Sequence, residues 1–399
     1  MIQKISLFLF VALSAHAYNL SEILDATKRS HSANTIKELA SSKIADEALT
    51  NSYEAPKLGL SSAHARNPVE NGMEYGVSFS QNIAKPFASE YKENASKYAI
   101  KAIEQKTQHE LHILGLEVTS RYHNACVAKE MSSLAQVLFD EQNKRVGQLQ
   151  SAYELGEISK QNLLFHKLDL SKLTQKLNFY KRSEIAKRSY LNESVDNLTI
   201  ETLACDDLVG IKKDVKLGNI DEHGEMQEMA SMQNATDALL SAQQTPLSSL
   251  GYDLMYHKEL DTTRYTFGVN IPLDFMTSEQ ELHRTKYLSL SSALQEQKAA
   301  MYQQIQQKSY SKQLKIETLF DEYMLYKEEI VPMSLELKEL SKLAQKSGEG
   351  TLMEHLDSSR SYTQNVLEML EIKQKYYGEL FELYKTADLS IGENCATID

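Results

Sequence analysis

Two acidic side chains in the last quarter of the chain have a spacing that could serve chemistry. Glu354 and Asp357 are three residues apart, which places both carboxylates on one face of a helix. Such a pair can act as a general acid and base, bind a cation, or simply face water. The residues alone favour the solvated face. Met353 and His355 add soft donor atoms, but no His-x-x-x-His spacing accompanies them, so we expect no metal site.

The rest of the composition argues against an enzyme and against a nucleic-acid surface. The sequence has no glycine-rich phosphate loop, and no set of Ser, His and Asp or of Cys and His whose arrangement supports nucleophilic catalysis. We therefore expect no catalytic residues and no cofactor. The formal net charge is −12, whereas binding to nucleic-acid phosphates needs clustered Lys and Arg.

The three cysteines give little guidance about pairing. Cys126, Cys205 and Cys395 are odd in number and far apart in the sequence. An exported protein can close one bridge between them, but their spacing indicates neither a disulfide framework nor a zinc site. Unpaired or incidental thiols are the favoured interpretation.

The first residues have the pattern of an export signal. A lysine precedes an apolar stretch at residues 5–14, and residues 15–17 form a small-x-small cleavage site. We expect residues 1–17 to be a signal peptide and the mature chain to start at Tyr18. The rest of the sequence has no apolar run near the roughly 20 residues that a spanning helix needs. Any membrane insertion is therefore expected to use β-strands.

The second half of the chain repeats the first half at a constant offset. Three pairs of landmark glycines are each 192 residues apart: Gly59 and Gly251, Gly76 and Gly268, and Gly156 and Gly348. A long internal repeat predicts two copies of one structural unit. We expect a first repeat at residues 18–191, a joining segment at 192–218, a second repeat at 219–387 and a C-terminal tail at 388–399.

Each repeat is expected to contain two strands and three helices. Large apolar side chains alternate with small or polar ones in four segments, near residues 56–65, 73–81, 250–257 and 265–271. Very long helical patterns, with apolar positions at spacings of three and four, cover residues 89–155 and 278–346. Shorter helices are expected at residues 20–51 and 159–190. The joining segment shows no period, and we expect it to form an exposed belt.

Glycines mark the turns between the long helices and their return partners. Gly156 and Gly348 follow the long helices, where glycine tolerates the left-handed backbone of a helix end. Ser159 is the expected N-cap of the first return helix, and Gly350 and Thr351 repeat that arrangement in the second. Within the second long helix, a proline at position 332 is expected to kink or divide it, because proline removes a backbone donor.

The number of strands predicts an oligomer. Four strands in one chain cannot close a membrane barrel, since even small barrels need about eight. Open strand edges inside lipid would leave backbone groups unsatisfied, at several kcal/mol each. Several chains must therefore share one barrel, and three chains would supply twelve strands.

The sequence resembles the TolC-type family of outer-membrane efflux proteins over nearly the whole mature chain. The resemblance rests on the duplicated layout and on four motifs: GEISKQNLL at 156–164, GEGTLMEHLD at 348–357, GVNIPL at 268–273 and IVP at 330–332. The last two motifs are more similar to the branch that serves cation and heavy-metal efflux pumps. Pro272 is expected to end the last strand at the periplasmic edge, which would leave Asp274 reachable from the periplasm.

The resemblance implies both an architecture and a function. The expected fold is mainly α with a β-barrel portion: a homotrimeric tube in which twelve shared strands cross the outer membrane and long helices form a periplasmic tunnel. Such a channel does no chemistry. It gives substrates a passive exit in a tripartite efflux pump, whose other partners are a periplasmic adaptor and an inner-membrane pump.

The resemblance also maps functional positions onto this chain. Acidic residues that narrow the family's tunnel correspond to Glu354 and Asp357, with Asn162 at the matching place in the first repeat. The helix turns expected to dock the adaptor contain Gly156, Ser159, Gly348, Gly350 and Thr351. The family often has a basic residue where this chain has Gly350, so the resemblance does not support a polar latch at that position.

Two other classes of protein share some of these features. A periplasmic efflux adaptor also has a signal peptide and a helical hairpin, but it is expected to have one hairpin rather than two copies at a fixed offset. An exported coiled-coil structural protein would explain the helical periodicity. It would not explain four alternating strands.

Overall fold

The structure is a computed structural model in which the chain divides into two compact units. It describes residues 17–50, 54–66, 71–84, 86–196, 198–245, 247, 249–273 and 278–390. The first unit comprises the described residues of Met1–Thr35, Glu110–Gly218 and Ile305–Asp399, and the second those of Ile36–His109 and Asn219–Gln304. Each unit therefore draws on both repeats. Residues 1–16 of the expected signal peptide, Asp274, and residues 391–399 of the expected tail, with Cys395, lie outside the described residues.

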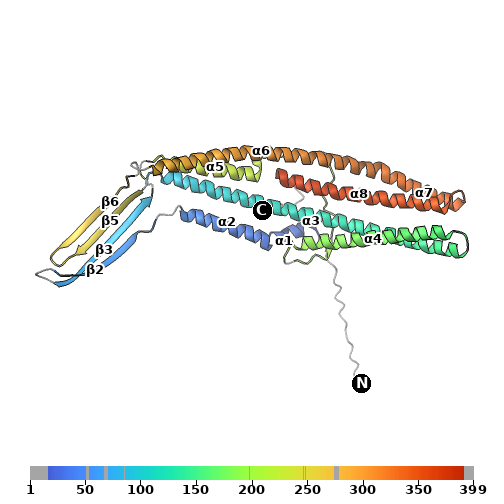
Figure 1. Ribbon diagram of the computed structural model, residues 1–399, viewed down its shortest axis with the longest axis horizontal. Helices are drawn as coiled ribbons and strands as arrows, with labels where there is room; N and C mark the ends of the chain where they lie inside the picture. Colours follow the sequence, from blue (N-terminus) through green and yellow to red (C-terminus); the bar gives the residue numbers. More distant parts are fainter. Residues whose placement is uncertain are drawn as a thin grey trace, which may run out of the picture. The chain divides into compact units, whose positions relative to one another are not determined.

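The second unit contains a four-stranded antiparallel sheet at the places that the alternation predicts (Figure 1). Its strands are β2 (Lys57–Arg66), β3 (Asn71–Ala84), β5 (Ser249–Lys258) and β6 (Thr263–Asn270), in the spatial order β2-β3-β5-β6. The central pair, β3 and β5, joins one strand from each repeat. Within the described chain, β2 and β6 are the sheet's edges. β6 ends just before Pro272, as expected of a residue that cannot donate to a ladder.

The register of this sheet separates an apolar face from a polar one. Residues directly opposite one another share a face, so each cross-strand row can be followed through all four strands. Two apolar rows are Leu58–Phe79–Leu254–Phe267 and Leu60–Val77–Tyr256–Tyr265, and a polar row on the other face is Ser61–Gly76–His257–Arg264. The apolar face lies open, because Leu60 is 77% and Tyr265 79% exposed.

In the second unit, a short helix of the second repeat packs against the long helix of the first repeat. α5 (Gly224–Ala242) follows the turn η1 (Ile220–Glu222) and buries Met226 and Met229. The Ser231 hydroxyl donates to Gln105 Oε1 at 2.7 Å, which ties α5 to the long helix α3 (Ser89–Glu154). The unit also holds most of α2 (His31–Thr50) and the first part of α6 (Glu279–Leu325).

The first unit is built from two helical hairpins (Figure 1). One pairs α3 with α4 (Lys160–Asn192), and the other pairs α7 (Val331–Ser347) with α8 (Leu352–Ala387). Apolar positions at helical spacing form a shared core from α3, α4, α6 and α8 whose buried members include Val127, Leu177, Ile316, Tyr376 and Phe381. The sequence correctly predicted α3, whose expected range of 89–155 exceeds the observed one by a single residue.

The second long helix is divided near Pro332, as predicted. α6 ends at Leu325, a π-helical turn η3 (Tyr326–Ile330) follows, and α7 begins at Val331 with the proline in its first turn. Leu325, Ile330 and Val331 all keep right-handed helical angles, so the chain stays helical through this point, and the residue without an N–H follows directly after the π-turn. In the π-turn the Val331 N–H donates to the carbonyl of Tyr326, five residues earlier, so the hydrogen-bond spacing widens by one residue just before the proline.

The expected helix at residues 20–51 is wrong as a single element. The structure has α1 (Leu20–Thr27) and α2, separated by a short break. Buried Ser30 causes the interruption, because its hydroxyl accepts the Ala33 N–H at 3.2 Å and so caps a new helix. α1 has its own N-cap, Asn19, which forms a capping box with Glu22.

The joining segment is only partly the exposed belt that was expected. After α4 it runs largely without helix or strand, apart from β4 (Thr202–Leu203), which pairs in parallel with β1 (Ala17–Tyr18). Ile200 and Leu203 are buried against α1, α3 and the end of α4, so apolar packing holds this part of the segment on the first unit.

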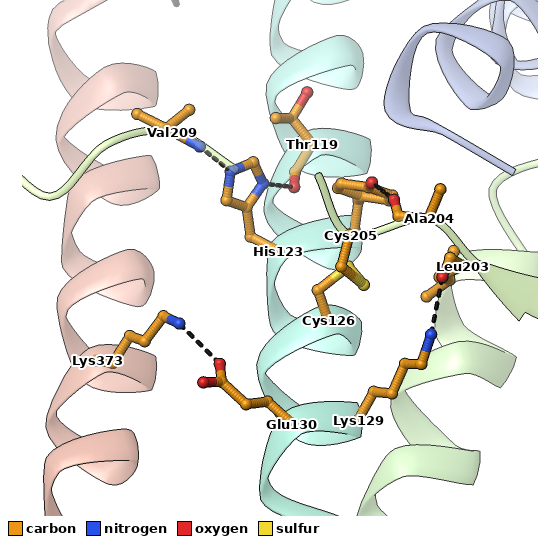
Figure 2. The surroundings of a disulfide bond; sticks show 11 residues. Thr119, His123, Cys126, Lys129, Glu130, Leu203, Ala204, Cys205, Val209 and Lys373 are labelled. Carbon is orange, nitrogen blue, oxygen red and sulfur yellow. Dashed lines mark hydrogen bonds and ion pairs between the residues drawn. A yellow bond between two sulfur atoms is a disulfide. The ribbon is translucent and has the colours of Figure 1, made fainter. Parts of the chain in front are cut away.

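The expectation of unpaired thiols is wrong for two of the three cysteines. Cys126 of α3 and Cys205 of the joining segment form a disulfide, shown in Figure 2. They are 79 residues apart in sequence but 5.6 Å apart between Cα atoms. Spacing in the sequence could not reveal the pair, because chain folding brings the segment back across α3.

Candidate functional site

The predicted site residues lie at the two helix turns of the first unit. Gly156 follows α3 with a φ of 78°, and Gly348 follows α7 with a φ of 79°. Both angles lie in the left-handed region that residues with a Cβ adopt at a cost. The two turns therefore share one backbone solution, as the repeat predicts.

The return helices begin at the residues expected to cap them. The Ser159 hydroxyl accepts the Asn162 N–H at 3.2 Å at the start of α4. The Thr351 hydroxyl accepts the Glu354 N–H at 3.2 Å at the start of α8. These bonds satisfy donors that the first turn of a helix cannot pair internally, so the capping role of both residues is confirmed. Their part in docking a partner stays a prediction.

Gly350 is set by close packing rather than by backbone angle. A Cβ at this position would lie 2.8 Å from the Cβ of Ala344 and 3.2 Å from its carbonyl carbon. The turn is this tight because the N–H groups of Glu349 and Gly350 both donate to the Ala344 carbonyl at 3.0 Å. A basic side chain at this position would force the end of α7 to shift.

Glu354 uses one carboxylate oxygen to complete the cap of its own helix. Its Oε2 accepts the Thr351 N–H at 2.8 Å, which makes a reciprocal capping box with the Thr351 hydroxyl. The hydrogen bonds from the Thr351 backbone and side chain lower the pKa of the Glu354 carboxyl, although the residue is exposed. The carboxylate is thus ionised and held at the first turn of α8.

Asp357 lies one turn further along α8, beside a groove of about 220 Å³. The groove runs between α3, α4 and α8, and its charged lining contains both signs, with Glu141, Arg145, Asp169, Lys172, Asp357 and Arg360 among its members. Asn162 is half-buried in the first turn of α4. In the part of the chain that the structure describes, no hydrogen bond or ion pair joins Asn162, Glu354 and Asp357 to one another.

Apolar packing nevertheless brings the first turns of the two return helices together. Leu163 of α4 and Leu356 of α8 are buried with Leu149 of α3 in a small core. Next to it, Nε2 of buried His166 lies 3.3 Å from Sδ of Met353. Asn162 directly precedes the core residue Leu163, and Glu354 lies two residues before the core residue Leu356. Both are therefore carried on helices whose first turns pack against each other.

Polar contacts that the sequence did not predict also link the hairpins. The Arg360 guanidinium lies 3.3 Å from the Asp169 carboxylate, which connects α8 with α4. Lys338 of α7 and Arg145 of α3 both lie within 4 Å of the Glu141 carboxylate, at 3.4 and 3.6 Å. The pairs Arg360–Asp169 and Lys338–Glu141 are 191 and 197 residues apart in sequence, so helical periodicity carries no signal for them. Arg145 and Glu141 are four residues apart on α3, a spacing that does place both side chains on one helix face.

A buried polar cluster fixes α7 against α8. The Ser341 hydroxyl lies 3.2 Å from Nδ1 of His355 and also contacts the Ser358 hydroxyl. Burial lowers the pKa of His355, and the positive charges of Arg145, Lys338 and Lys342 lower it further. Burial likewise lowers the pKa of His166. Both rings are therefore neutral packing groups at neutral pH.

The arrangement is suited to holding charge at a defined place rather than to catalysis. The capping box holds the Glu354 carboxylate at the start of α8, and the groove beside Asp357 is lined by four basic and three acidic side chains. Among the described residues, no helix is long and apolar enough to cross a membrane.

Comparisons with known proteins identify the fold. No protein-family model matches the sequence, and no curated protein matches it. Among solved structures, the Campylobacter jejuni CmeC outer membrane channel is 15% identical, with a TM-score of 0.72 over 92% of this chain and 85% of that one. The open state of the Neisseria gonorrhoeae MtrE outer membrane channel is 17% identical, with a TM-score of 0.74 over 92% and 88% of the two chains.

A third match is to CusC, whose structures describe folding and transmembrane channel formation. It is 12% identical, with a TM-score of 0.75 over 92% of this chain and 91% of that one. The chain therefore has the fold of the TolC-type outer-membrane channels, as the sequence resemblance predicted, and the expected mainly helical class with four strands per chain is confirmed. The closed twelve-stranded barrel and the trimer stay predictions. The scores are too similar to select a branch, so the cation and heavy-metal branch stays a prediction.

Proposed function

We propose that this chain is the outer-membrane channel of a tripartite efflux pump, which gives substrates a passive exit and does no chemistry. The observation that carries the proposal is the coincidence of this fold, over nearly all of the chain, with an open four-stranded sheet whose apolar face is exposed. A coiled-coil structural protein or a periplasmic adaptor would have no use for such a sheet.

The apolar face of the sheet suits contact with lipid. Its rows of Leu, Val, Phe and Tyr form a continuous exposed apolar surface of a kind that soluble monomers avoid. The opposite face carries Ser, Gly, His and Arg, which suits a water-filled lumen. The strands, of 8 to 14 residues, have lengths near the roughly 9 to 11 that a tilted membrane strand needs.

The sheet's edges call for further copies of the chain. β2 and β6 each present one side of unpaired backbone groups within the described structure. In lipid, each unpaired group costs several kcal/mol, so the edges must be joined. Three copies would close a twelve-stranded barrel by pairing β6 of one chain with β2 of the next.

A basic face on α4 supports the same assembly. α4 carries eight Lys or Arg and two Asp or Glu, in a chain of net charge −12. Its exposed apolar stripe consists of Leu164, Leu168 and Phe179. The basic row beside that stripe consists of exposed Lys160, Lys167 and Lys181, at multiples of seven residues.

The helical segment before and after the π-turn carries acidic residues beside an apolar stripe, which complements the basic row and apolar stripe of α4. Its exposed apolar stripe consists of Met333, Leu337 and Leu340. The acidic row consists of exposed Glu322, Glu329 and Glu336, again seven residues apart. An apolar stripe flanked by charge is the pattern of a coiled-coil seam, in which flanking residues choose the partner. α4 of one copy and α7 of the next are therefore proposed to form the seam between protomers.

The acidic residues at the start of α8 are proposed to line the channel's periplasmic aperture. Three copies would bring Glu354 and Asp357 together as six carboxylates, with Asn162 nearby on the packed first turn of α4. The exposed turns that contain Gly156, Ser159, Gly348, Gly350 and Thr351 are proposed to dock the periplasmic adaptor, which in turn recruits the inner-membrane pump.

Reconstitution tests this function directly. Purified full-length protein in planar lipid bilayers should give stepwise conductance, and native mass measurement in detergent should give a trimer. In cells, the protein should fractionate with the outer membrane. A stable detergent-solubilised monomer with full strand content would overturn the assembly, and a trimer that inserts without conductance would overturn the channel.

A further inference from the structure

The polar face of the four-stranded sheet carries two ionisable side chains that lie down against the sheet. Asp253 and His257 are both on β5, four residues apart, so the alternation of a strand places them on the same face. Met255 lies between them on that face and is exposed, whereas Asp253 and His257 are half-buried. The difference in exposure follows from the residue that lies directly opposite each ionisable side chain.

Asp253 lies over a glycine of the neighbouring strand. Its partner directly across the ladder is Gly268 of β6. A Cβ built on Gly268 would lie 2.6 Å from Oδ1 and 2.7 Å from Cγ of Asp253, which is too close for a real Cβ atom. Asn270 Nδ2 donates to Asp253 Oδ1 at 3.1 Å, which holds the carboxylate along β6. The carboxylate therefore fills the space that a side chain at position 268 would need.

His257 has the same relation to a glycine of the strand on its other side. Its partner across the ladder is Gly76 of β3. A Cβ built on Gly76 would lie 2.7 Å from Cε1 and 2.8 Å from Nδ1 of His257, and Gly76 is itself buried. Side chains of strands usually stand roughly perpendicular to the sheet. These two follow the sheet instead, one over β3 and the other over β6.

The width of a twelve-stranded barrel depends on how its inner side chains lie. Side chains just fill a barrel of about 8 strands, whereas barrels of about 16 to 18 strands leave an aqueous channel. The barrel proposed above lies between these limits, so side chains that project toward its axis would take up much of the lumen. With the polar face inward, the space over each glycine keeps one ionisable side chain of every protomer out of that lumen.

We infer that Gly268 and Gly76 set the bore of the barrel: each makes room for an ionisable side chain of β5 to lie along the wall, which keeps the lumen open to larger solutes. The inference rests on the proposed function, because it takes the polar face as the wall of a lumen. A Cβ at either glycine meets the far end of a flexible side chain. The expected response is therefore that Asp253 or His257 turns away from the wall, while the sheet still forms.

Passage of sized thiol reagents through the barrel tests the bore. Asn82 is on the same face of the sheet, one row beyond Asp253 on the side of α3, so a reagent from the hairpin end must pass both rows to reach it. Full-length protein with Asn82→Cys and Cys395→Ser carries one reactive thiol, since Cys126 and Cys205 form a disulfide. Maleimide polyethylene glycols of graded mass are added outside intact cells, and the largest one that reacts gives the size limit.

Gly268→Ala should shift the size limit to a smaller mass, because the added methyl group displaces Asp253 into the lumen. Adding Asp253→Ala to that variant should restore the limit, since no carboxylate remains to be displaced. Gly76→Ala should also lower the limit, through His257, and it decides the question if the Gly268 variant does not assemble. Gly147→Ala adds the same methyl group where nothing lies within 4 Å, so it should leave the limit unchanged.

Trimer formation in detergent, measured for each variant, separates a narrower bore from failed assembly. An unchanged limit in the assembled glycine variants of the sheet would overturn the inference, and so would a Gly268→Ala limit that Asp253→Ala does not restore. An equal shift in Gly147→Ala would overturn it as well. Failure of the proposed function gives a different result: even the smallest reagent would then fail to reach position 82 in the chain whose glycines are all intact.

Discussion

At the scale of single residues, alanine substitution is expected to change stability in opposite directions at a turn glycine and at a glycine within a helix. Gly348 has a left-handed backbone, so Gly348→Ala should destabilise the protein by about 1 to 2 kcal/mol. Gly147 is exposed within α3 and has no neighbour within 4 Å of a Cβ, so Gly147→Ala should stabilise by up to about 1 kcal/mol. Thermal unfolding in detergent measures both. Equal shifts in the same direction would contradict the assigned backbone roles.

His123 connects α3 to Val209 of the joining segment only while its ring is neutral. Nδ1 donates to the Thr119 carbonyl at 2.8 Å, which leaves Nε2 free to accept the Val209 N–H (Figure 2). Desolvation by burial lowers the pKa of His123 from 6.5 to about 4, against the opposing effect of the bond to Thr119. A proton on Nε2 would replace its acceptor lone pair with a second donor.

This titration predicts a loss of stability in acid. Between pH 6.5 and 4, the unfolded chain takes up a proton that folded His123 excludes, so the free energy of unfolding falls as pH falls. The full effect is about 3 kcal/mol and is present above pH 6.5. Denaturant unfolding at pH 7 and 4 should show that His123→Gln removes this part of the slope.

At the scale of elements, the proposed seam between α4 and α7 can be tested by exchanging its charges. Lys167→Glu with Lys181→Glu places like charges across the seam and should lower trimer yield at low salt several-fold. Adding Glu329→Lys and Glu336→Lys should restore it, since each copy then carries both reversed rows. Size measurement in detergent gives the yield.

The same helix supplies the matched control for that experiment. Lys172→Glu with Lys176→Glu makes an identical charge change on the other flank of α4 and should affect the trimer less. High salt should narrow the difference between variants, because screening acts within about 8 Å at physiological ionic strength. Equal losses from both pairs of substitutions would mean that net charge, and not the basic row, governs assembly.

Elements with a strong internal period were predictable from sequence, and those held by distant contacts were not. The alternation around Val77 and Val269 predicts strands because one face of the sheet must be apolar. The break at Ser30 was missed, since one buried hydroxyl ends a helix without changing the period around it. The Cys126–Cys205 pair was missed because 79 residues of folded chain bring its members together.

The candidate site was predicted in outline but not in its detail. Helix-turn glycines and caps have local signatures, so Gly156 and Ser159 could be assigned to the turn before the structure was known. The capping box gives Glu354 a local role that the mapped motif did not indicate. Whether Glu354, Asp357 and Asn162 line an aperture depends on how copies assemble, which a single chain's sequence specifies only indirectly.

At the scale of the whole molecule, assembly would turn the start of α8 into a selectivity element. Six carboxylates around one axis favour cations over anions and attract divalent ions. Glu354→Gln with Asp357→Asn should therefore lower cation preference and relieve block by divalent cations in planar-bilayer recordings. Trimer yield should not change, because glutamine can still accept the Thr351 N–H in the capping box.

The control for selectivity removes the same charge elsewhere. Glu296→Gln with Glu328→Gln alters two exposed residues of α6 and η3 that are not among the proposed aperture residues, and should leave both selectivity and block unchanged. If the Glu354 and Asp357 double variant keeps its cation preference, these residues do not line the aperture. That result would not contradict the channel proposal, but it would mean that other residues line the periplasmic aperture.

The way in which α3 and α8 hold residues 203–212 of the joining segment bears on which positions of this chain can vary. Every hydrogen bond that α3 and α8 make to residues 203–212 ends on a main-chain N–H or C=O group. Main-chain groups are the same whatever the side chain, so these hydrogen bonds do not restrict which side chains residues 203–212 carry. Other contacts do restrict Cys205, which forms the disulfide, and Leu203, which is buried in the apolar core. The side chains that make these hydrogen bonds cannot be replaced so freely. They are Tyr122, His123, Lys129, Tyr376 and Tyr377. We therefore expect sequence alignments of distant relatives to be more reliable at these five helical positions than within residues 203–212.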